Sequence, residues 1–170
     1  MRDAQDMILF QVGENTFAIA ADAVDEIRPL EGVRPYLSGK TSHPNLARVK
    51  YTLIREKNGP RRLYFVVDAT AHFRMPKSEG NRILVMRREA TALLVGGIER
   101  MALVSGVSPL PRSFTGDERR WYKGLAVVQD KVIPVVDPTA LLGQEEIAIL
   151  QAGAKLAAAA DHRTGKAALA

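Results

Sequence analysis

Two aspartates and one histidine are the residues whose types and spacing first point to chemistry in this chain. Asp68 and Asp137 each follow a Val-Val pair and precede a short helical stretch, and paired carboxylates can perform acid–base catalysis. His72 lies four residues after Asp68, where a carboxylate could orient an imidazole base. The same context is typical of helix N-caps. We therefore expect Asp68 and Asp137 to cap helices and His72 to be exposed or partly packed.

Other catalytic and cofactor signatures are missing from the sequence. The chain has no Cys, which excludes thiolate catalysis, Cys-ligated zinc and disulfides. It has no nucleophile elbow, P-loop, zinc-protease motif or dinucleotide-binding fingerprint. His43 and His162 show no ligand spacing with His72, and the Gly96-Gly97 pair predicts a bend. We expect a non-enzymatic protein with no cofactor and no metal.

The segment 117–123 combines cations with aromatic residues. In a small β-barrel such a segment could stack bases and contact phosphates, so binding of single-stranded nucleic acid is the alternative function. The other interpretation is a loop whose Trp121 packs where two halves of the chain meet, with Arg119 and Arg120 solvated. The net charge of only +5 supports weak attraction to anions and no more. We therefore favour the loop and expect no nucleic-acid partner.

Hydropathy predicts a cytoplasmic protein without direct membrane insertion. No apolar run reaches the roughly 18 residues that a membrane span needs. The first six residues are polar and include two acids, which is unlike a secretory signal.

An internal repeat indicates that the chain contains two diverged copies of one unit. Three matches occur in the same order, and repeats of this kind fix the architecture. The matched segments are 8–10 with 83–85, 24–35 with 98–109, and 66–71 with 135–140. We predict copy one at about 1–76 and copy two at about 77–143, together forming the domain 1–143. A C-terminal helix is predicted over 144–160 and a disordered tail over 161–170.

Each copy has the alternation and turn residues of short β-strands. Hairpin turns are predicted at Gly13-Glu14-Asn15, at Asn58-Gly59-Pro60 and at Gln129-Asp130. Residues 63–67 and 132–136 are nearly continuous apolar runs, which predicts strands buried on both faces. Many short strands at even spacing favour small barrels, because closure removes exposed edges. The predicted fold class is all-β.

Several motifs, in this order and spacing, resemble the CheW-like domains, the coupling modules of bacterial chemotaxis. The resemblance spans about residues 7–143. The motifs are Ile8 to Ile19, Val24-Asp25-Glu26-Ile27-Arg28, Tyr64 to Asp68, Gly124 to Val128, and Val132 to Asp137. The resemblance implies two five-stranded β-barrel subdomains related by pseudo-twofold symmetry, with short helices after the Val-Val-Asp strands. It also implies a signalling adaptor that couples chemoreceptors to a CheA-type histidine kinase.

The resemblance further implies partners and contact residues. One face of a barrel would meet the regulatory domain of the kinase, and a groove between barrels would meet the helical cytoplasmic tip of a chemoreceptor. Val24, Glu26, Ile27 and Arg28 match a strand associated with partner contact. The open alternative is that Val24 and Ile27 are core residues and Glu26 is solvated.

One motif of the family is absent. CheW-like domains usually have Gly-(Val/Ile)-x-Asn-x-Arg-Gly before the first Val-x-Asp strand, and its Arg contacts a partner. Residues 45–60 lack this pattern. Arg48 or Arg55 could take the place of that Arg, and the spacing does not choose between them. Two other outcomes stay open: the protein could serve a non-chemotaxis signalling array, such as one for surface motility, or it could have lost kinase coupling.

Overall fold

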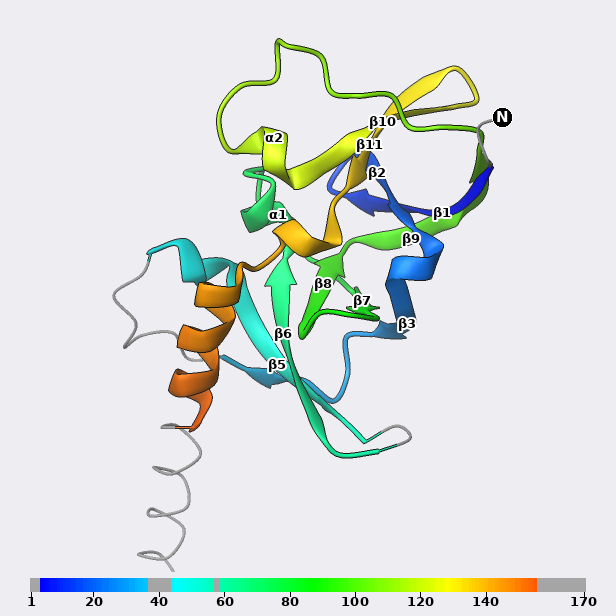
Figure 1. Ribbon diagram of the computed structural model, residues 1–170. Helices are drawn as coiled ribbons and strands as arrows, with labels where there is room; N and C mark the ends of the chain where they lie inside the picture. Colours follow the sequence, from blue (N-terminus) through cyan, green and yellow to red (C-terminus); the bar gives the residue numbers. More distant parts are fainter. Residues whose placement is uncertain (1–3, 37–43, 57–58, 156–170) are drawn as a thin grey trace, which may run out of the picture.

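Two mixed β-sheets and a few short helices form the computed structural model, which describes residues 4–36, 44–56 and 59–155 (Figure 1). The five-stranded sheet has the order β10-β11-β2-β1-β9, and the six-stranded sheet has the order β3-β7-β8-β6-β5-β4. The first sheet comprises β1 (Gln5–Val12), β2 (Asn15–Ala20), β9 (Gly97–Val104), β10 (Tyr122–Val128) and β11 (Lys131–Val136). The second comprises β3 (Val24–Pro29), β4 (Arg34–Pro35), β5 (Val49–Arg55), β6 (Arg62–Asp68), β7 (Arg82–Met86) and β8 (Thr91–Val95).

Each sheet contains strands from both halves of the sequence. The first hairpin, β1–β2, pairs with β9 and β11 of the second half. The hairpin β7–β8 of the second half pairs with β3 and β6 of the first. The contacts β2–β11 and β8–β6 are both parallel, whereas the other strand pairs are antiparallel. The predicted sequence copies therefore do not coincide with the sheets, because each copy gives its first hairpin to the other sheet.

The predicted hairpin turns lie between the strands that they were expected to join. Gly13 has φ +61° between β1 and β2, a conformation that glycine adopts without steric cost. Gln129 and Asp130 have φ values of 50° and 66° between β10 and β11, which matches the two left-handed residues of a type I′ turn. Asn58 lies outside the described residues, although β5 and β6 flank it as predicted.

The main core lies between the two sheets and includes residues from both. Phe10 of β1 and Phe65 of β6 are fully buried in it. A smaller cluster on the opposite face of the six-stranded sheet includes Tyr64 and Val66. Strand β6 is therefore buried on both faces, as its apolar run predicted. The same prediction was wrong for the start of β11, where Val132 is 62% exposed.

Short helices follow both Val-Val-Asp strands, and the two aspartates cap them. Asp68 Oδ1 accepts hydrogen bonds from Thr70 N at 3.1 Å and Thr70 Oγ1 at 2.9 Å at the start of α1 (Ala69–His72). Asp137 Oδ1 accepts the equivalent bonds from Thr139, at 3.0 and 2.7 Å, at η3 (Pro138–Ala140). The remaining short helices are η1 (Ala21–Ala23), η2 (Pro44–Arg48) and α2 (Glu118–Trp121). The capping prediction is confirmed.

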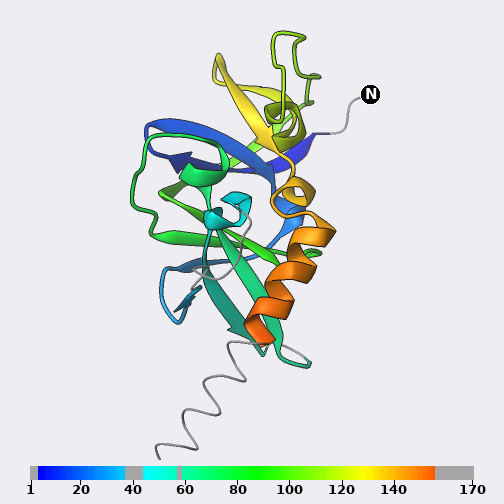
Figure 2. The ribbon, with the colours of Figure 1, turned by 90° about the vertical axis from the view of Figure 1, so that its left-hand side faces the viewer.

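A C-terminal helix runs beside β5 and β6 over residues 144–155 (Figures 1 and 2). Its Leu150 is fully buried in the main core, and Ile147 and Ala154 pack against that core. These positions follow the spacing of one helix face, as predicted. The predicted extension to 160 and the predicted disordered tail 161–170 lie outside the described residues.

Candidate protein-docking site

Arg55, at the end of β5, is a buried cation that joins β5 to β3. Its Nη2 lies 2.7 Å from Asp25 Oδ2, and its Nε lies 3.0 Å from Glu26 Oε2. The Arg55 side chain is only 7% exposed, and its Nη1 donates to Tyr64 Oη at 3.3 Å. Strands β3 and β5 are not hydrogen-bonded neighbours in the sheet order. These ion pairs therefore connect two strands that the backbone ladder leaves apart.

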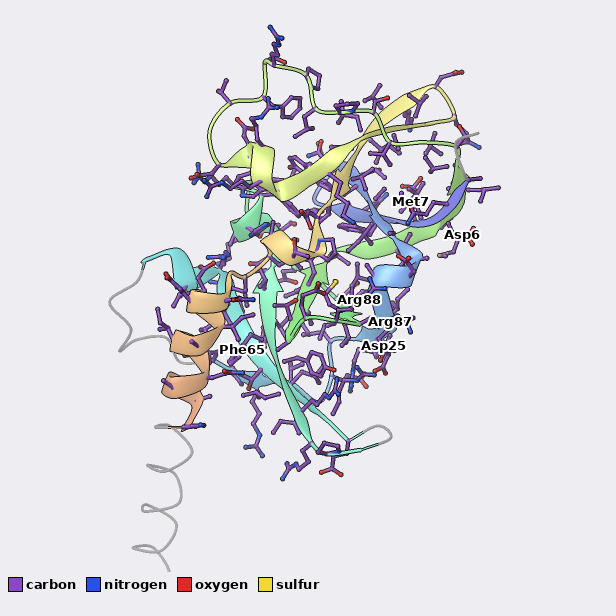
Figure 3. The ribbon with its side chains drawn as sticks, in the orientation of Figure 1. Asp6, Met7, Asp25, Phe65, Arg87 and Arg88 are labelled. Atoms are coloured by element: carbon purple, nitrogen blue, oxygen red, sulfur yellow. The ribbon has the colours of Figure 1, made fainter. Side chains whose placement is uncertain are left out.

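The surroundings of Arg55 keep its guanidinium charged. Burial alone lowers its pKa, but the hydrogen bond to Asp25 and the nearby Tyr64 and Glu26 reverse this, and the net effect is a raised pKa. Arg87 adds a second cation, with Nη1 3.7 Å from Asp25 Oδ1. It also donates to the carbonyl oxygens of Asp22 and Val24. Figure 3 shows Asp25 and Arg87 next to each other on the β3 side of the molecule.

Strand β3 presents one apolar side chain and one cation near this network. Val24 is buried, whereas Ile27 is 41% exposed and Arg28 is half-buried. The pairing with β7 shifts register between Val24 and Glu26, and such a bulge redirects the following side chains. The sequence left open the alternative that Val24 and Ile27 are core residues and that Glu26 is solvated. The structure agrees with this alternative for Val24 only. Ile27 is exposed, and Glu26 is half-buried against Arg55.

Arg48 has a different environment from Arg55. Its Nη1 and Nη2 each lie 2.9 Å from a carboxylate oxygen of Glu146, and Nη2 also donates to Leu141 O at 2.9 Å. This bidentate pair attaches η2 to the C-terminal helix. Burial raises the pKa of Glu146, but hydrogen bonds from Arg48 and the Gly143 N–H outweigh it and lower the pKa overall. The structure therefore brings Arg55, and not Arg48, next to the motif residue Glu26.

His72 is buried, so the expectation of an exposed or partly packed histidine was wrong. It is 5% exposed, and its ring centroid lies 4.8 Å from that of Phe73 and 5.6 Å from that of Trp121. Its Nε2 is buried and has no hydrogen-bond partner in the described part of the chain. Burial, helped by the charge of Arg48 and opposed by Glu146, lowers the pKa of His72 to about 4. The imidazole is therefore neutral at physiological pH.

We expect stability to fall on mild acidification because of His72. The unfolded chain takes up a proton on this residue near pH 6.5, whereas the folded chain does so only near pH 4. Stability is therefore fully present above about pH 6.5 and is lost as the pH falls toward 4. Between pH 7 and pH 5 the loss is about 2 kcal/mol. Urea denaturation at a series of pH values measures it.

The matched control for this measurement is His72→Gln, which removes the titrating group. The variant should lose less stability than the native chain between pH 7 and pH 5. The lowered pKa of Glu146 also favours the fold at neutral pH, and its effect remains in both proteins. Equal pH profiles for the two chains would contradict the assignment.

The cationic aromatic segment packs where the two sequence halves meet. Trp121 of α2 contacts His72 and Phe73 of the first half, with a Phe73–Trp121 centroid distance of 6.0 Å. Arg119 Nη1 donates to the carbonyl oxygens of Phe114 at 2.9 Å and Pro111 at 3.3 Å. The packing of Trp121 agrees with the loop interpretation, although Arg119 is bonded to the backbone as well as exposed. No contact in this segment favours the nucleic-acid alternative.

Sequence reasoning missed an exposed apolar surface on the β10–β11 hairpin. Val127 is 65% exposed and is the direct cross-strand partner of the exposed Val132. Leu125 and Pro134 form the next pair on the same face, as the period of two along a strand requires. We call these four residues the apolar stripe. No sequence signal revealed it, because both faces of this hairpin have apolar residues and only the structure shows which face is covered.

The two edge strands β3 and β9 each expose an apolar residue at matched repeat positions. Ile27 is 41% exposed on β3, and Met101, its counterpart in the repeat, is 52% exposed on β9. Single exposed apolar residues are common on protein surfaces, so these two positions become candidates through their match in the repeat. Within 4–36, 44–56 and 59–155, no group of three His, Asp or Glu side chains is placed to share a metal ion. The arrangement is suited to binding proteins.

The chain is a β-rich module of two mixed sheets, with apolar residues exposed on β3, on β9 and on the β10–β11 hairpin. A sequence model of the CheW-like domain matches residues 6–146, and the chain belongs to this family. CheW-like domains are scaffold and adaptor modules of chemotaxis signalling. In the described part of the structure, no helix has both the length and the apolar character for crossing a membrane.

A solved structure supports the same fold. The scaffolding protein TtCheW from Thermoanaerobacter tengcongensis is similar to this chain with a TM-score of 0.64 at 16% sequence identity. The similarity covers 85% of this chain and 92% of that one. No curated protein matches the sequence.

Proposed function

We propose that this protein is an adaptor that couples the cytoplasmic tip of a chemoreceptor to the regulatory domain of a CheA-type histidine kinase. The membership of the CheW-like family supports this proposal. The observation that carries it furthest is the pair of exposed apolar residues at matched positions, Ile27 on one sheet and Met101 on the other. An adaptor needs separate surfaces for separate partners, and this chain presents them on separate sheets.

The partner surface that we assign to the kinase is the exposed side of β3. Ile27 and Arg28 are the residues available for contact there, because Val24 is buried. Glu26 and Arg55 support this surface from behind through their 3.0 Å ion pair. Arg48 contributes to attachment of the C-terminal helix and not to this surface. Of the six candidate contact residues, two face a partner and two position them. The other two are Val24, which is buried, and Arg48, which holds the C-terminal helix.

We further infer that the two sheets correspond to twin five-stranded barrels related by a pseudo-twofold axis. The order β10-β11-β2-β1-β9 has the same connections as β5-β6-β8-β7-β3 in the other sheet, and each contains one parallel contact at the equivalent place. Strand β4 pairs with β5, and Ser108, which matches Arg34 of β4 in the repeat, makes an isolated bridge to Leu125 of β10 at the equivalent place. Superposition of the two strand sets tests this inference, and a failure to align would contradict it.

The substitution Ile27→Asp should weaken binding to the kinase regulatory domain. Placing a carboxylate in an apolar contact leaves it desolvated and unpaired, and the loss of one such contact lowers affinity by about tenfold or more. Because Ile27 is 41% exposed, the variant should keep its fold. Isothermal titration calorimetry with the kinase domain from the same organism measures the affinity.

The matched control is Ile54→Asp on β5. Ile54 has nearly the same exposure, 40%, and lies in the same sheet, but it is not on β3. Its affinity for the kinase domain should equal that of the native chain. Equal loss in both variants would contradict the assignment of β3. No binding of the native chain to either the kinase domain or a receptor tip would remove the coupling function.

A further inference from the structure

A cavity of about 610 Å³ lies where five short segments of the chain meet. Its walls come from η2, α1, α2, η3 and the start of the helix 144–155, and Lys50 of β5 adds to them. Sites for small molecules occupy about 300 to 1,000 Å³ and commonly lie between structural units. The cavity therefore has the size and location of a ligand site, and it includes neither β3 nor the apolar stripe.

The cavity has an excess of positive charge that no acid of its walls balances. Both acidic residues of the walls are already paired. Glu146 has a bidentate contact with Arg48 at 2.9 Å, and Asp117 lies 3.4 Å from Arg74. The two remaining cations of the walls are Lys50 and Arg120. Neither has an acidic partner within 4.0 Å among the residues that the structure describes, so the cavity has an unbalanced charge of two.

His72 contributes its ring to the cavity wall. The residue is 5% exposed, and its Nε2 is shielded from solvent, without a hydrogen bond in the described part of the chain. A molecule in the cavity would therefore meet the ring and not this nitrogen. The half-buried Trp121 beside His72 completes this part of the wall.

We propose that this cavity binds a small phosphate-bearing anion. Lys50 and Arg120 would contact the phosphate oxygens, since charge-assisted hydrogen bonds from cations are the strongest that phosphate accepts. A phosphate dianion matches the unbalanced charge of two, which a single carboxylate does not. This inference goes beyond the adaptor function and does not depend on it.

Trp121 is the only tryptophan of the chain, so its fluorescence reports on the cavity directly. Inorganic phosphate and, separately, 5′-AMP would be titrated into the full chain at low ionic strength. We expect a saturable change in Trp121 emission with at least one of them. Arg120→Glu and Lys50→Glu should each weaken binding by about tenfold. Both side chains are exposed, so these variants should fold.

The matched control is Arg100→Glu, which makes the same charge change at an exposed position of β9. It should bind phosphate as the native chain does. Equal weakening by Arg100→Glu would show unspecific attraction and overturn the proposal. Absence of a saturable change with both probes would overturn it as well. A third result would also overturn the proposal: an emission change with a polyglutamate peptide but with neither phosphate compound. The cavity would then recognise an acidic protein segment.

Discussion

Replacing Arg55 by leucine is expected to lower the free energy of unfolding by about 3 kcal/mol. The guanidinium is 7% exposed and contacts both Asp25 and Glu26. Without it, Glu26 would lose its ion pair with Arg55, and Asp25 would lose the 2.7 Å contact while keeping Arg87 at 3.7 Å. Asp25 and Glu26 keep 30% and 34% of their side-chain surface exposed. The expected loss therefore lies at the lower end of the range for broken buried ion pairs. Urea denaturation measures the loss.

Two further variants make the Arg55 measurement specific. Arg61→Ala removes an arginine that is 68% exposed and that lies 3.0 Å from Glu56, and an exposed pair of this kind contributes at most about 1 kcal/mol. Adding Asp25→Asn and Glu26→Gln to Arg55→Leu should recover much of the lost stability, because the two carboxylate charges that Arg55 balanced are then removed. If Arg55→Leu lowered the free energy of unfolding no more than Arg61→Ala does, the ion pairs that join β3 to β5 would not stabilise the fold.

Replacing Gly124 by alanine is expected to cost about 3 kcal/mol through overpacking. A Cβ at Gly124 would overlap the carbonyl oxygen of Ser108 and lie 2.7 Å from Val107 Cγ1. Ser108 and Leu125 exchange two backbone hydrogen bonds of 2.8 Å at this place, so the backbone cannot move away without losing them. Chemical denaturation with far-ultraviolet circular dichroism measures the cost.

The control for Gly124→Ala is Gly97→Ala at the start of β9. A Cβ at Gly97 meets nothing within 4 Å, so the change should alter stability by less than about 0.5 kcal/mol. The slope of the unfolding free energy against urea should be the same for all three proteins. A neutral Gly124→Ala variant would mean that the segment around Ser108 adjusts freely, and the close approach would then have no structural role.

Features of the fold that depend on neighbouring residues could be predicted from the sequence. The turns at Gly13 and at Gln129-Asp130, and the caps at Asp68 and Asp137, each depend on side chains within a few positions. The exchange of hairpins between the sheets could not be predicted in this way. The repeat shows that two similar units exist, but strand pairing between distant segments leaves no local pattern. Only the structure shows that β2 lies beside β11.

The candidate contact residues, too, could be predicted from the sequence only in part. The sequence pointed to Glu26, Ile27, Arg48 and Arg55, but spacing could not decide between the two arginines. The structure shows that Arg55 lies 3.0 Å from Glu26, and the choice between the two arginines as a partner contact stays a prediction. The exposure of Val132 and the burial of His72 were also beyond sequence patterns. An apolar side chain or a neutral histidine is compatible with either a buried or an exposed position. Packing against distant elements decides which of the two it occupies.

The exchange of hairpins between the two sheets has a consequence for how the protein is made. Ala18 of β2 pairs with Val135 of β11, so the first hairpin leaves the ribosome long before its neighbour has been synthesised. Until then the apolar faces of β1 and β2 have no permanent cover, and segments of this kind are prone to aggregation. A nascent chain that stops before β9 contains every strand of the six-stranded sheet, but only β1 and β2 of the five-stranded sheet. The five-stranded sheet is therefore completed only late in translation, after β9, β10 and β11 have been made.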